Sequence, residues 1–430
     1  MAETVPPDTH GHVGTRRSET SGKVADFRYK RSSQHGHAQR DSIVRDGWNG
    51  SKAKRSDKRA HPHGDRSSQS KRANGNASRP AAEGRAETPV SANPSREAYA
   101  AIDLGTNNCR LLIARPSGRD FTVIDAFSRV VKLGEGLATS GRLSDVAMER
   151  TLKALSICAD KLKRRKVRLA RSVATEACRR AANGPAFIER VREETGIALD
   201  IISAEEEARL AVLGCHILLE DGDGPAIIFD IGGGSTELVL VEPGGKIPRI
   251  IDWQSVPWGV VSLTDTVGRM EGGREARLAR YEKMREVVST SFAPFGRRIV
   301  EDAKRDDIRL LGTSGTVTTL ASLHLELPQY DRNAVDGLIV PSRAMRDISG
   351  SLSGMSPGER SELPCIGRDR SDLVVAGCAI LESILDLWPA ERLGVADRGI
   401  REGILRSLMA AERQSERSLL ALQKMRERNG

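Results

Sequence analysis

The chain has 430 residues, of which 67 are Lys or Arg and 58 are Asp or Glu, giving a formal net charge of +9. This length is sufficient for two domains with complete hydrophobic cores. No run approaches the roughly 18 apolar residues that a membrane span requires, and the N-terminus lacks the short apolar core of a secretory signal. We therefore expect a cytoplasmic protein with no membrane partner.

The first 97 residues differ in composition from the remainder of the chain. Residues 1–98 hold 19 Lys and Arg against 11 Asp and Glu, which accounts for +8 of the total charge. They are rich in Ser, Gly, Asn and Pro and contain too few apolar side chains to form a core. We expect residues 1–97 to form a disordered basic arm. It is either a solubilising extension or a contact for a polyanion, and nucleic acid is expected to bind only non-specifically through it.

From Ala98 onward the sequence alternates between strand and helix patterns. The segment YAAIDLGTNNCRLLIA indicates a strand, a glycine turn and a strand, and FTVIDAF indicates a third strand. A helix is expected from about Ser144 to Lys166, with Ser144 as its N-cap and Val146 among its apolar positions. A strand, a helix, a strand and a last helix over about 204–219 follow. This order predicts a mixed sheet flanked by helices.

The same opening then occurs a second time. The segment AIIFDIGGGSTELVLVE again indicates a strand, a glycine turn and a strand, and RIIDWQSV indicates the third strand. Aligning the two openings places Asp103 on Asp230 and Arg110 on Glu237. Two similar α/β domains facing each other across a cleft are predicted, with chance similarity between two hairpins as the alternative. The predicted domains are 98–221 and 222–430.

Two glycine-rich turns contain groups that are suited to phosphate. In DIGGGSTE, Gly233 and Gly234 let backbone amides approach an anion closely, and Ser235 and Thr236 add hydroxyl donors. The segment GTSGT places Ser314 at a junction between strand and helix, where amides and the helix dipole favour negative charge. With the first hairpin turn, three phosphate loops are expected. Each turn taken alone is also explained as a tight connection.

Three carboxylates are candidates for a cation site. Asp103 and Asp230 end strands at the two hairpin turns, and Glu237 lies on the strand that returns from the second turn. Carboxylate oxygens together with retained waters suit Mg²⁺. We therefore expect a magnesium site here. The alternative is that these acids only accept hydrogen bonds from turn amides.

The run Glu205, Glu206 and Glu207 begins a predicted helix. Successive side chains on a helix point about 100° apart, so at most one of the three is expected to enter the cleft. Glu207 has the small residues Ala204 and Ala211 as its i−3 and i+4 neighbours and is the candidate for a general base. Acidic first turns also complement the helix dipole, and the residues alone leave both interpretations open.

Taken together, these motifs resemble the exopolyphosphatase and guanosine pentaphosphate phosphohydrolase family over about 98–408. The resemblance rests on AIDLGTNNCRLLIA, SVATEACRRAANG, IISAEEEARL, IIFDIGGGSTELVLV, LLGTSGTVTTLA and VADRGIREGIL, in that order. It implies two ribonuclease H-like domains of the actin-like ATPase superfamily around a cleft, in a short two-domain form. The sequence departs from the family at TNN after Gly105, where a Ser-Asn-Ser-like run is usual, and at Ala204, where Gly is frequent.

The resemblance also implies roles for individual residues. Glu207 would be the catalytic base, and Asp103, Asp230 and Glu237 would organise Mg²⁺ and the attacking water. Arg110, which aligns with Glu237, is expected to add a cationic contact to phosphate. The other residues implied in phosphate contact are Asn107, Arg179, Gly234, Ser235 and Ser314.

The expected activity is Mg²⁺-dependent release of the terminal phosphate of inorganic polyphosphate as orthophosphate. Hydrolysis of the 5′-terminal phosphate of guanosine pentaphosphate requires nearly the same groups and is the first alternative. A kinase of the same superfamily and a non-catalytic polyphosphate-binding regulator are the others. The sequence leaves open whether the chain forms a homodimer.

Overall fold

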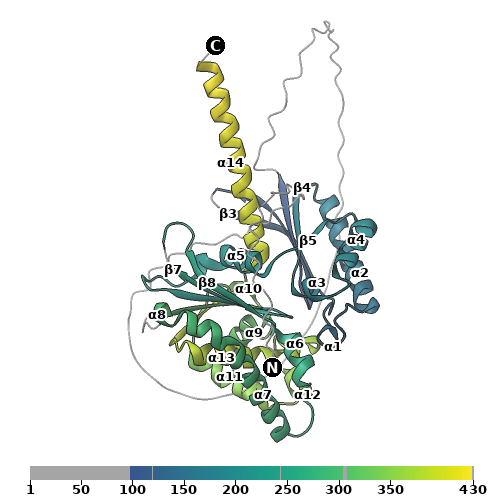
Figure 1. Ribbon diagram of the computed structural model, residues 1–430, viewed down its shortest axis with the longest axis vertical. Helices are drawn as coiled ribbons and strands as arrows, with labels where there is room; N and C mark the ends of the chain where they lie inside the picture. The colour runs from purple at the N-terminus through teal and green to yellow at the C-terminus, as the bar shows by residue number, and fades with distance from the viewer. Residues whose placement is uncertain (1–96, 119, 243, 304–307, 429–430) are drawn as a thin grey trace, which may run out of the picture. The chain divides into compact units, whose positions relative to one another are not determined.

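The computed structural model describes residues 97–118, 120–242, 244–303 and 308–428. The arm was predicted to comprise residues 1–97, of which only residue 97 is among the described residues. Within them the chain forms two β-sheets, each covered by helices (Figure 1). No helix in the described part of the chain is both long enough and apolar enough to cross a membrane.

The first sheet is mixed and has the strand order β3-β2-β1-β4-β5. Its strands are β1 (Ala98–Leu104), β2 (Asn108–Ser117), β3 (Asp120–Val130), β4 (Val167–Ala174) and β5 (Leu199–Ile201). Strand β1 pairs antiparallel with β2 and parallel with β4. It is buried along its whole length, as expected of a central strand with both faces covered.

The helices of the first half are α1 (Leu137–Ser140), α2 (Asp145–Arg164), α3 (Glu176–Arg180), α4 (Gly184–Thr195), α5 (Ala204–Cys215) and a 3₁₀ turn, η2 (His216–Leu218). Helices α2 and α4 pack against strands of the first sheet. The predicted N-cap of α2 is confirmed, because the Ser144 hydroxyl accepts a hydrogen bond from the Ala147 amide. Val146 was expected on the apolar face but is 66% exposed, since the buried face of α2 begins at Ala147 and Met148.

The second sheet is also mixed, with the order β10-β11-β9-β6-β7-β8. Its strands are β6 (Ala226–Ile231), β7 (Thr236–Glu242), β8 (Arg249–Val256), β9 (Arg309–Thr313), β10 (Ile339–Pro341) and β11 (Arg392–Ala396). The helices of this half are α6 (Val260–Val267), α7 (Arg274–Arg298), α8 (Val300–Ala303), α9 (Gly315–His324), α10 (Arg332–Val335), α11 (Ser342–Gly354), α12 (Pro357–Glu362), η3 (Arg368–Arg370) and α13 (Leu373–Leu387). The large core on one face of the sheet includes residues of α7, α9, α11 and α13, and α5 packs on the other face.

The predicted alignment of the two sheet openings is reproduced in the strand register. Asp103 pairs with Arg110 across β1 and β2, and Asp230 pairs with Glu237 across β6 and β7. The same backbone hydrogen bond closes both turns: the Gly105 amide donates to the Asn108 carbonyl and the Gly232 amide to the Ser235 carbonyl, each at 2.9 Å. The two hairpins are therefore equivalent in structure as well as in sequence.

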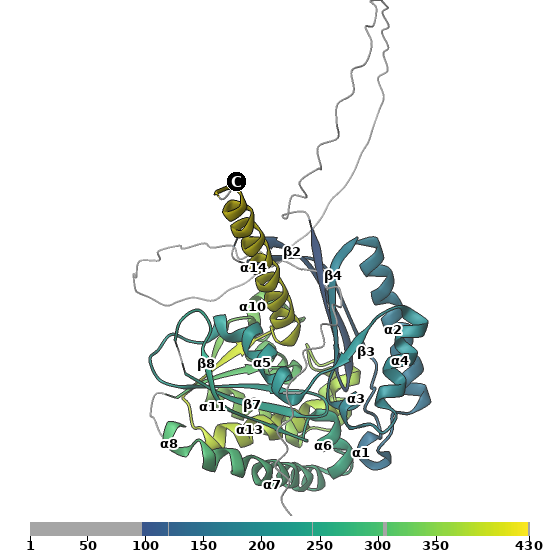
Figure 2. The same ribbon diagram turned by 45° about the horizontal axis from the view of Figure 1, so that its top comes forward.

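The C-terminal helix α14 (Ile400–Arg428) follows the last strand segment of the second half but packs on the first sheet. Its residues Ile404 and Leu405 are fully buried in the same core as β1. Figures 1 and 2 show α14 on one face of the first sheet and α2 and α4 on the other. Residues from both ends of the described chain thus share one core. The domain boundary near residue 221 remains a prediction.

Candidate active site

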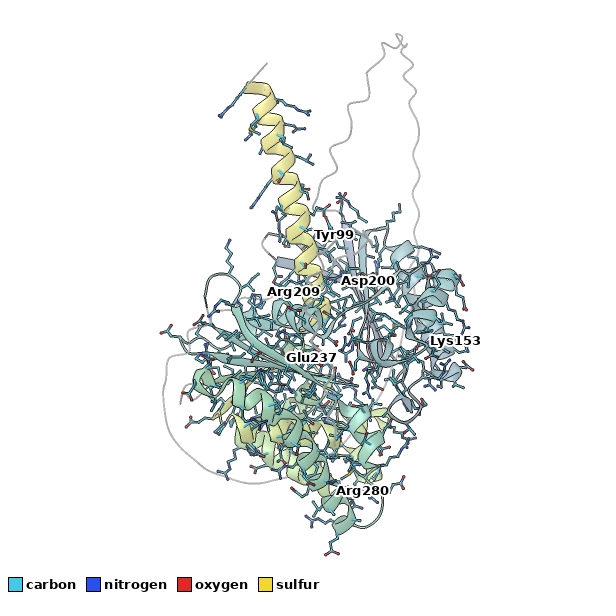
Figure 3. All side chains as sticks on the ribbon, viewed as in Figure 1. Tyr99, Lys153, Asp200, Arg209, Glu237 and Arg280 are labelled. Atoms are coloured by element: carbon cyan, nitrogen blue, oxygen red, sulfur yellow. The ribbon has the colours of Figure 1, made fainter. Side chains whose placement is uncertain are left out.

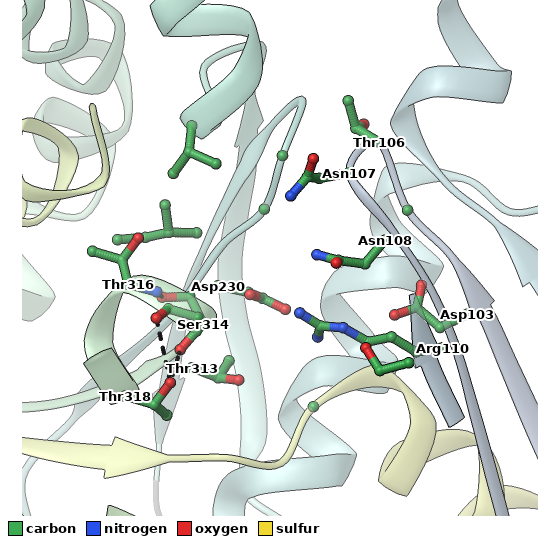
Figure 4. Close-up of a pocket in the computed structure, with 18 of the residues that line it drawn as sticks. Asp103, Thr106, Asn107, Asn108, Arg110, Asp230, Thr313, Ser314, Thr316 and Thr318 are labelled. Carbon is green, nitrogen blue, oxygen red and sulfur yellow. Dashed lines mark hydrogen bonds between the residues drawn. The ribbon is translucent and has the colours of Figure 1, made fainter. Parts of the chain in front are cut away.

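The two hairpin turns and the loop before α9 surround a cavity of about 650 Å³. Glu237, labelled in Figure 3, lies on β7 of the second sheet, and Figure 4 shows side chains from both sheets converging on the cavity. The predicted site residues that line it are Asp103, Asn107, Arg110, Glu207, Asp230, Gly233, Gly234, Ser235, Glu237 and Ser314. Arg179 and Thr236 were predicted with them but are not among the lining residues.

The two hairpin turns touch each other, and the contact leaves little space for a side chain at either glycine. A Cβ atom on Gly233 would lie 3.0 Å from Cβ of Thr106 and 3.1 Å from the Asn107 amide nitrogen. A Cβ atom on Gly234 would lie 2.6 Å from Oγ1 of Thr106 and 2.9 Å from Cγ of Glu176. Larger side chains would therefore force the turns apart. Within the described residues, the buried Oγ1 of Thr106 and Oδ1 of Asn107 have no hydrogen-bond partner, so polar capacity remains for a ligand.

Of the three consecutive glutamates, only Glu207 is buried in the cavity wall. The Ser203 hydroxyl caps α5 by accepting a hydrogen bond from the Glu206 amide at 3.1 Å. Glu205 is exposed, and Glu206 forms ion pairs with Arg171 at 2.8 Å and Arg209 at 2.6 Å. The helical rotation between neighbours thus separates one carboxylate from the other two.

Burial raises the pKa of the acids that face the cavity. The pKa of Glu207 lies well above its usual range, because the carboxyl is buried and close to the charge of Glu237, although Arg179 opposes the shift. Burial and the same neighbouring charge raise the pKa of Asp230 to about 8. Burial also raises the pKa of Asp103. These acids hold protons more tightly than exposed carboxyls do.

Glu237 is held in place by two hydroxyl groups. Ser235 and Ser255 donate hydrogen bonds to its Oε1 atom, at 2.7 and 2.9 Å. Burial raises the pKa of Glu237, and the two hydroxyls partly offset that effect. The hydroxyl of Ser235, predicted to contact phosphate, is therefore directed at Glu237 in this structure.

Arg179 and Thr236 make contacts behind the cavity wall. The Arg179 guanidinium donates to Glu207 at 3.0 Å, to Glu176 at 2.6 Å and to the Ile202 carbonyl at 2.8 Å. Its donors are directed at the candidate base. The Thr236 hydroxyl donates to the Trp258 carbonyl at 2.7 Å. Contact of either side chain with phosphate remains a prediction.

The three predicted metal ligands do not form one compact cluster. Over the described ranges, no group of three or more His, Cys, Asp or Glu side chains is arranged to hold a metal ion. In Figure 4, the Arg110 side chain extends from the Asp103 side toward Asp230. Asp103 and Asp230 nevertheless offer the oxygen donors that Mg²⁺ prefers, and their side chains accept no hydrogen bond from a described residue. The donor set fits a Mg²⁺ ion that keeps waters and phosphate oxygens as its other ligands.

Sequence reasoning missed the arginines that the second half contributes to the cavity. The arginines that line the cavity, besides Arg110, are Arg332, Arg368, Arg370, Arg398 and Arg401. Among the described residues, Arg110, Arg370 and Arg401 form no ion pair. Unpaired guanidinium groups in a cavity are suited to a polyanion. The family segment VADRGIREGIL contains Arg398 and Arg401, but no role had been assigned to either residue, and no motif marked the other three arginines.

Two mixed-sheet α/β domains around a polar cavity define the class of protein. The model of the Ppx/GppA phosphatase family matches residues 112–412. Exopolyphosphatase 2 of Mycobacterium tuberculosis is 30% identical over 322 residues, which cover 72% of this chain and 98% of that protein. A putative exopolyphosphatase of Haemophilus influenzae is 29% identical over 315 residues, which cover 72% of this chain and 90% of that protein.

The crystal structure of an Aquifex aeolicus Ppx/GppA family member is similar to the described chain, with a TM-score of 0.59 and 29% sequence identity. The match covers 73% of this chain and 97% of that one. The chain belongs to the Ppx/GppA phosphatase family. The family resemblance expected from the motifs and the two-domain α/β fold are both confirmed.

Proposed function

We propose that this protein is an exopolyphosphatase, which hydrolyses the terminal phosphate of inorganic polyphosphate and releases orthophosphate. The observation that carries the proposal is a buried carboxyl of raised pKa, Glu207, in the wall of a cavity that also contains glycine turns and unpaired arginines. A raised pKa makes this carboxylate a stronger base than an exposed glutamate. Relatives named exopolyphosphatase, at 29–30% identity, support the same assignment.

In the proposed reaction, Glu207 accepts a proton from a water molecule as the water oxygen bonds to the terminal phosphorus. The bond from that phosphorus to the bridging oxygen breaks, and the bridging oxygen leaves as the new end of the shortened chain. Turn amides near Gly233 and Gly315 and the Arg370 guanidinium stabilise the charge on the phosphoryl oxygens. Arg179 holds the carboxylate of the base in one orientation.

We include Mg²⁺ in the proposal, with Asp103 and Asp230 as its protein ligands and Glu237 nearby. When bound, the ion neutralises charge on phosphate oxygens. The raised pKa values of these acids follow from burial without a cation. A divalent cation would favour their ionised forms, because opposite charge lowers a carboxyl pKa.

The test is Glu207→Gln, which keeps the shape of the side chain and removes the base. We expect kcat for phosphate release from polyphosphate to fall by about 10²- to 10⁴-fold, with polyphosphate binding retained. The exposed Glu205→Gln on the same helical turn is the matched control and should match wild type. A Glu207→Gln rate within threefold of wild type would contradict the assignment. Release of phosphate without an added phosphate acceptor would exclude a kinase. Binding of polyphosphate by the wild-type protein without release of phosphate would instead support the non-catalytic regulator.

One observation favours guanosine pentaphosphate as a second candidate substrate. Tyr330 is the only aromatic side chain among the described residues that line the cavity, and it is 44% exposed. Arg370 lies close enough to interact with it electrostatically, and Leu373 and Val374 line the same cavity. Inorganic polyphosphate has no group that uses an aromatic or apolar wall, whereas a purine base stacks on one.

The two substrates are separated by Tyr330→Leu, measured against both at matched concentration. Loss of base stacking is expected to lower kcat/KM for guanosine pentaphosphate by about tenfold or more. The rate with inorganic polyphosphate should not change. If Tyr330→Leu affects both substrates equally, the ring has no role in base recognition.

A further inference from the structure

The face of α5 that carries Glu207 is also the face that meets α14. Glu207, Leu210 and Gly214 follow each other at i, i+3 and i+7, which places them on one side of the helix. Leu210 and Ala211 share a core with Ile404 and Leu405 of α14. The position of the candidate base therefore depends on how these two helices pack.

The two helices approach so closely that only glycine fits at the contact. A Cβ atom on Gly214 of α5 would lie 1.9 Å from the Gly399 carbonyl oxygen. A Cβ atom on Gly403 of α14 would lie 1.9 Å from the Leu210 carbonyl oxygen. Both distances fall more than 1 Å short of normal Cβ contacts, and both partners are backbone atoms that cannot rotate away. The Arg406 guanidinium completes the contact by donating to the Leu213 and Gly214 carbonyls at 3.0 and 2.6 Å.

The other end of this contact lies beside Asp230. A Cβ atom on Gly399 would be 3.8 Å from Oδ2 of Asp230, in ordinary contact. Thr313 donates to the Arg398 carbonyl at 2.7 Å, and the buried carboxylate of Glu402 accepts from the Gly399 amide at 3.0 Å. This loop is thereby fixed to the strand end of the second sheet. Glu207 and Asp230 are therefore linked through the backbone contact of Gly214 with Gly399, and the Thr313 and Glu402 side chains hold the Gly399 loop in place.

We propose that Gly214 and Gly403 are positioning residues that set the separation between Glu207 and the Asp230 side of the cavity. Neither glycine lines the cavity, so each acts through the helix that carries the base or the loop that meets Asp230. The proposal rests on the proposed function, in which Glu207 activates water. A displacement of about 1 Å between reacting groups can cost on the order of 10²-fold in rate, which is the displacement that one added methyl group would demand.

The experiment compares Gly214→Ala and Gly403→Ala with Gly350→Ala. Gly350 is also a helical glycine, in α11, but a Cβ atom there would meet nothing within 4 Å. We expect kcat for polyphosphate to fall about 10²-fold in the first two variants while KM stays within threefold of wild type. The control variant should keep both constants. A purely structural defect would instead lower the folded fraction and leave the rate per folded molecule unchanged.

Arg406→Met is a second variant, because it removes both hydrogen bonds to the α5 carbonyls without adding an atom at the glycine contact. We expect this variant to lower kcat by about tenfold. It provides the test if either alanine variant fails to fold. A crystal structure of a folded variant should show a changed separation between the Glu207 and Asp230 carboxylates. Unchanged kcat in folded variants, or an unchanged separation, would overturn the proposal. If wild type releases no phosphate, the proposed function fails, and the measured separation still decides the positioning role.

Discussion

The buried position of Asp230 in the cavity disfavours the ionised form of its carboxyl group. Burial and the charge of Glu237 raise its pKa to about 8, against an ordinary value of 3.8. Between these values the folded state keeps a proton that the unfolded state has lost, so stability falls as pH rises through this window. A group placed for cation binding thus opposes folding at neutral pH in the absence of the cation.

Asp230→Asn should therefore stabilise the metal-free protein, and more at pH 8 than at pH 5. Each pKa unit corresponds to about 1.4 kcal/mol at most, and about 2–4 °C in Tm is expected per kcal/mol. Thermal unfolding in a chelator at the two pH values measures the effect. Asp347→Asn, on the exposed side of α11, should show no difference between them. An equal change in Tm at pH 5 and pH 8 would contradict the raised pKa.

Arg179 contributes to the position and the charge of Glu207. Its guanidinium lowers the pKa of that carboxyl, against the larger effect of burial. Arg179→Met should raise the pKa of the base further, so the acid limb of the pH–kcat profile should move to higher pH, because the base acts in its ionised form. Arg180→Met is the matched neighbour, since Arg180 contacts Glu176 at 3.7 Å and not Glu207. A rise in KM with an unchanged pH profile would instead indicate direct phosphate contact by Arg179.

At the scale of the element, the start of α14 is held by a buried acid. The neighbouring Arg401 and Arg332 lower the pKa of Glu402 to about 2, although burial alone would raise it. Its stabilising effect is complete above the ordinary glutamate pKa and is lost as pH falls toward 2. The ion pair with Arg332 spans 2.9 Å, and the Glu402 side chain is 3% exposed.

Glu402→Gln should reduce the free energy of unfolding at pH 7 by on the order of 3 kcal/mol. The difference from wild type should shrink as the pH is lowered below about 4. Denaturant titrations over this range provide the measurement, and the exposed Glu416→Gln on the same helix is the control. A difference that stays constant down to pH 3 would mean that the charge of Glu402 is not what stabilises the loop.

Where the local sequence pattern was strong, the predicted secondary structure is confirmed. The N-cap at Ser144, the strand 249–256 and the helix that begins after Ser314 all follow from short-range chemistry of caps, alternation and glycine. Val146 was misplaced because an apolar side chain at the first turn of a helix is not obliged to face the core. No local pattern predicted the packing of α14 against α5, because it depends on the contacts of Gly214 with Gly399 and of Gly403 with Leu210, which are far apart in the sequence.

At the scale of the whole molecule, residues 1–96 lie outside the described chain, and their charge is a property of sequence alone. The Mycobacterium tuberculosis relative is covered to 98%, whereas 28% of this chain has no counterpart in the match. Removal of residues 1–96 should weaken binding of long polyphosphate by about tenfold at low salt and flatten its salt dependence. Turnover of tripolyphosphate should be unchanged. Equal salt dependence with and without these residues would exclude a polyanion contact.

The sequence by itself determined the family, the two sheet openings and most of the acids of the site, because glycine turns, strand alternation and helix caps are encoded over short distances. Tertiary structure decided which polar groups face one another. It directed Arg179 to Glu207, turned Ser235 toward Glu237, added Arg370 and Arg401 to the cavity and joined α5 to α14. Burial and ion pairing depend on chain segments that meet only after folding, and no local pattern specifies them.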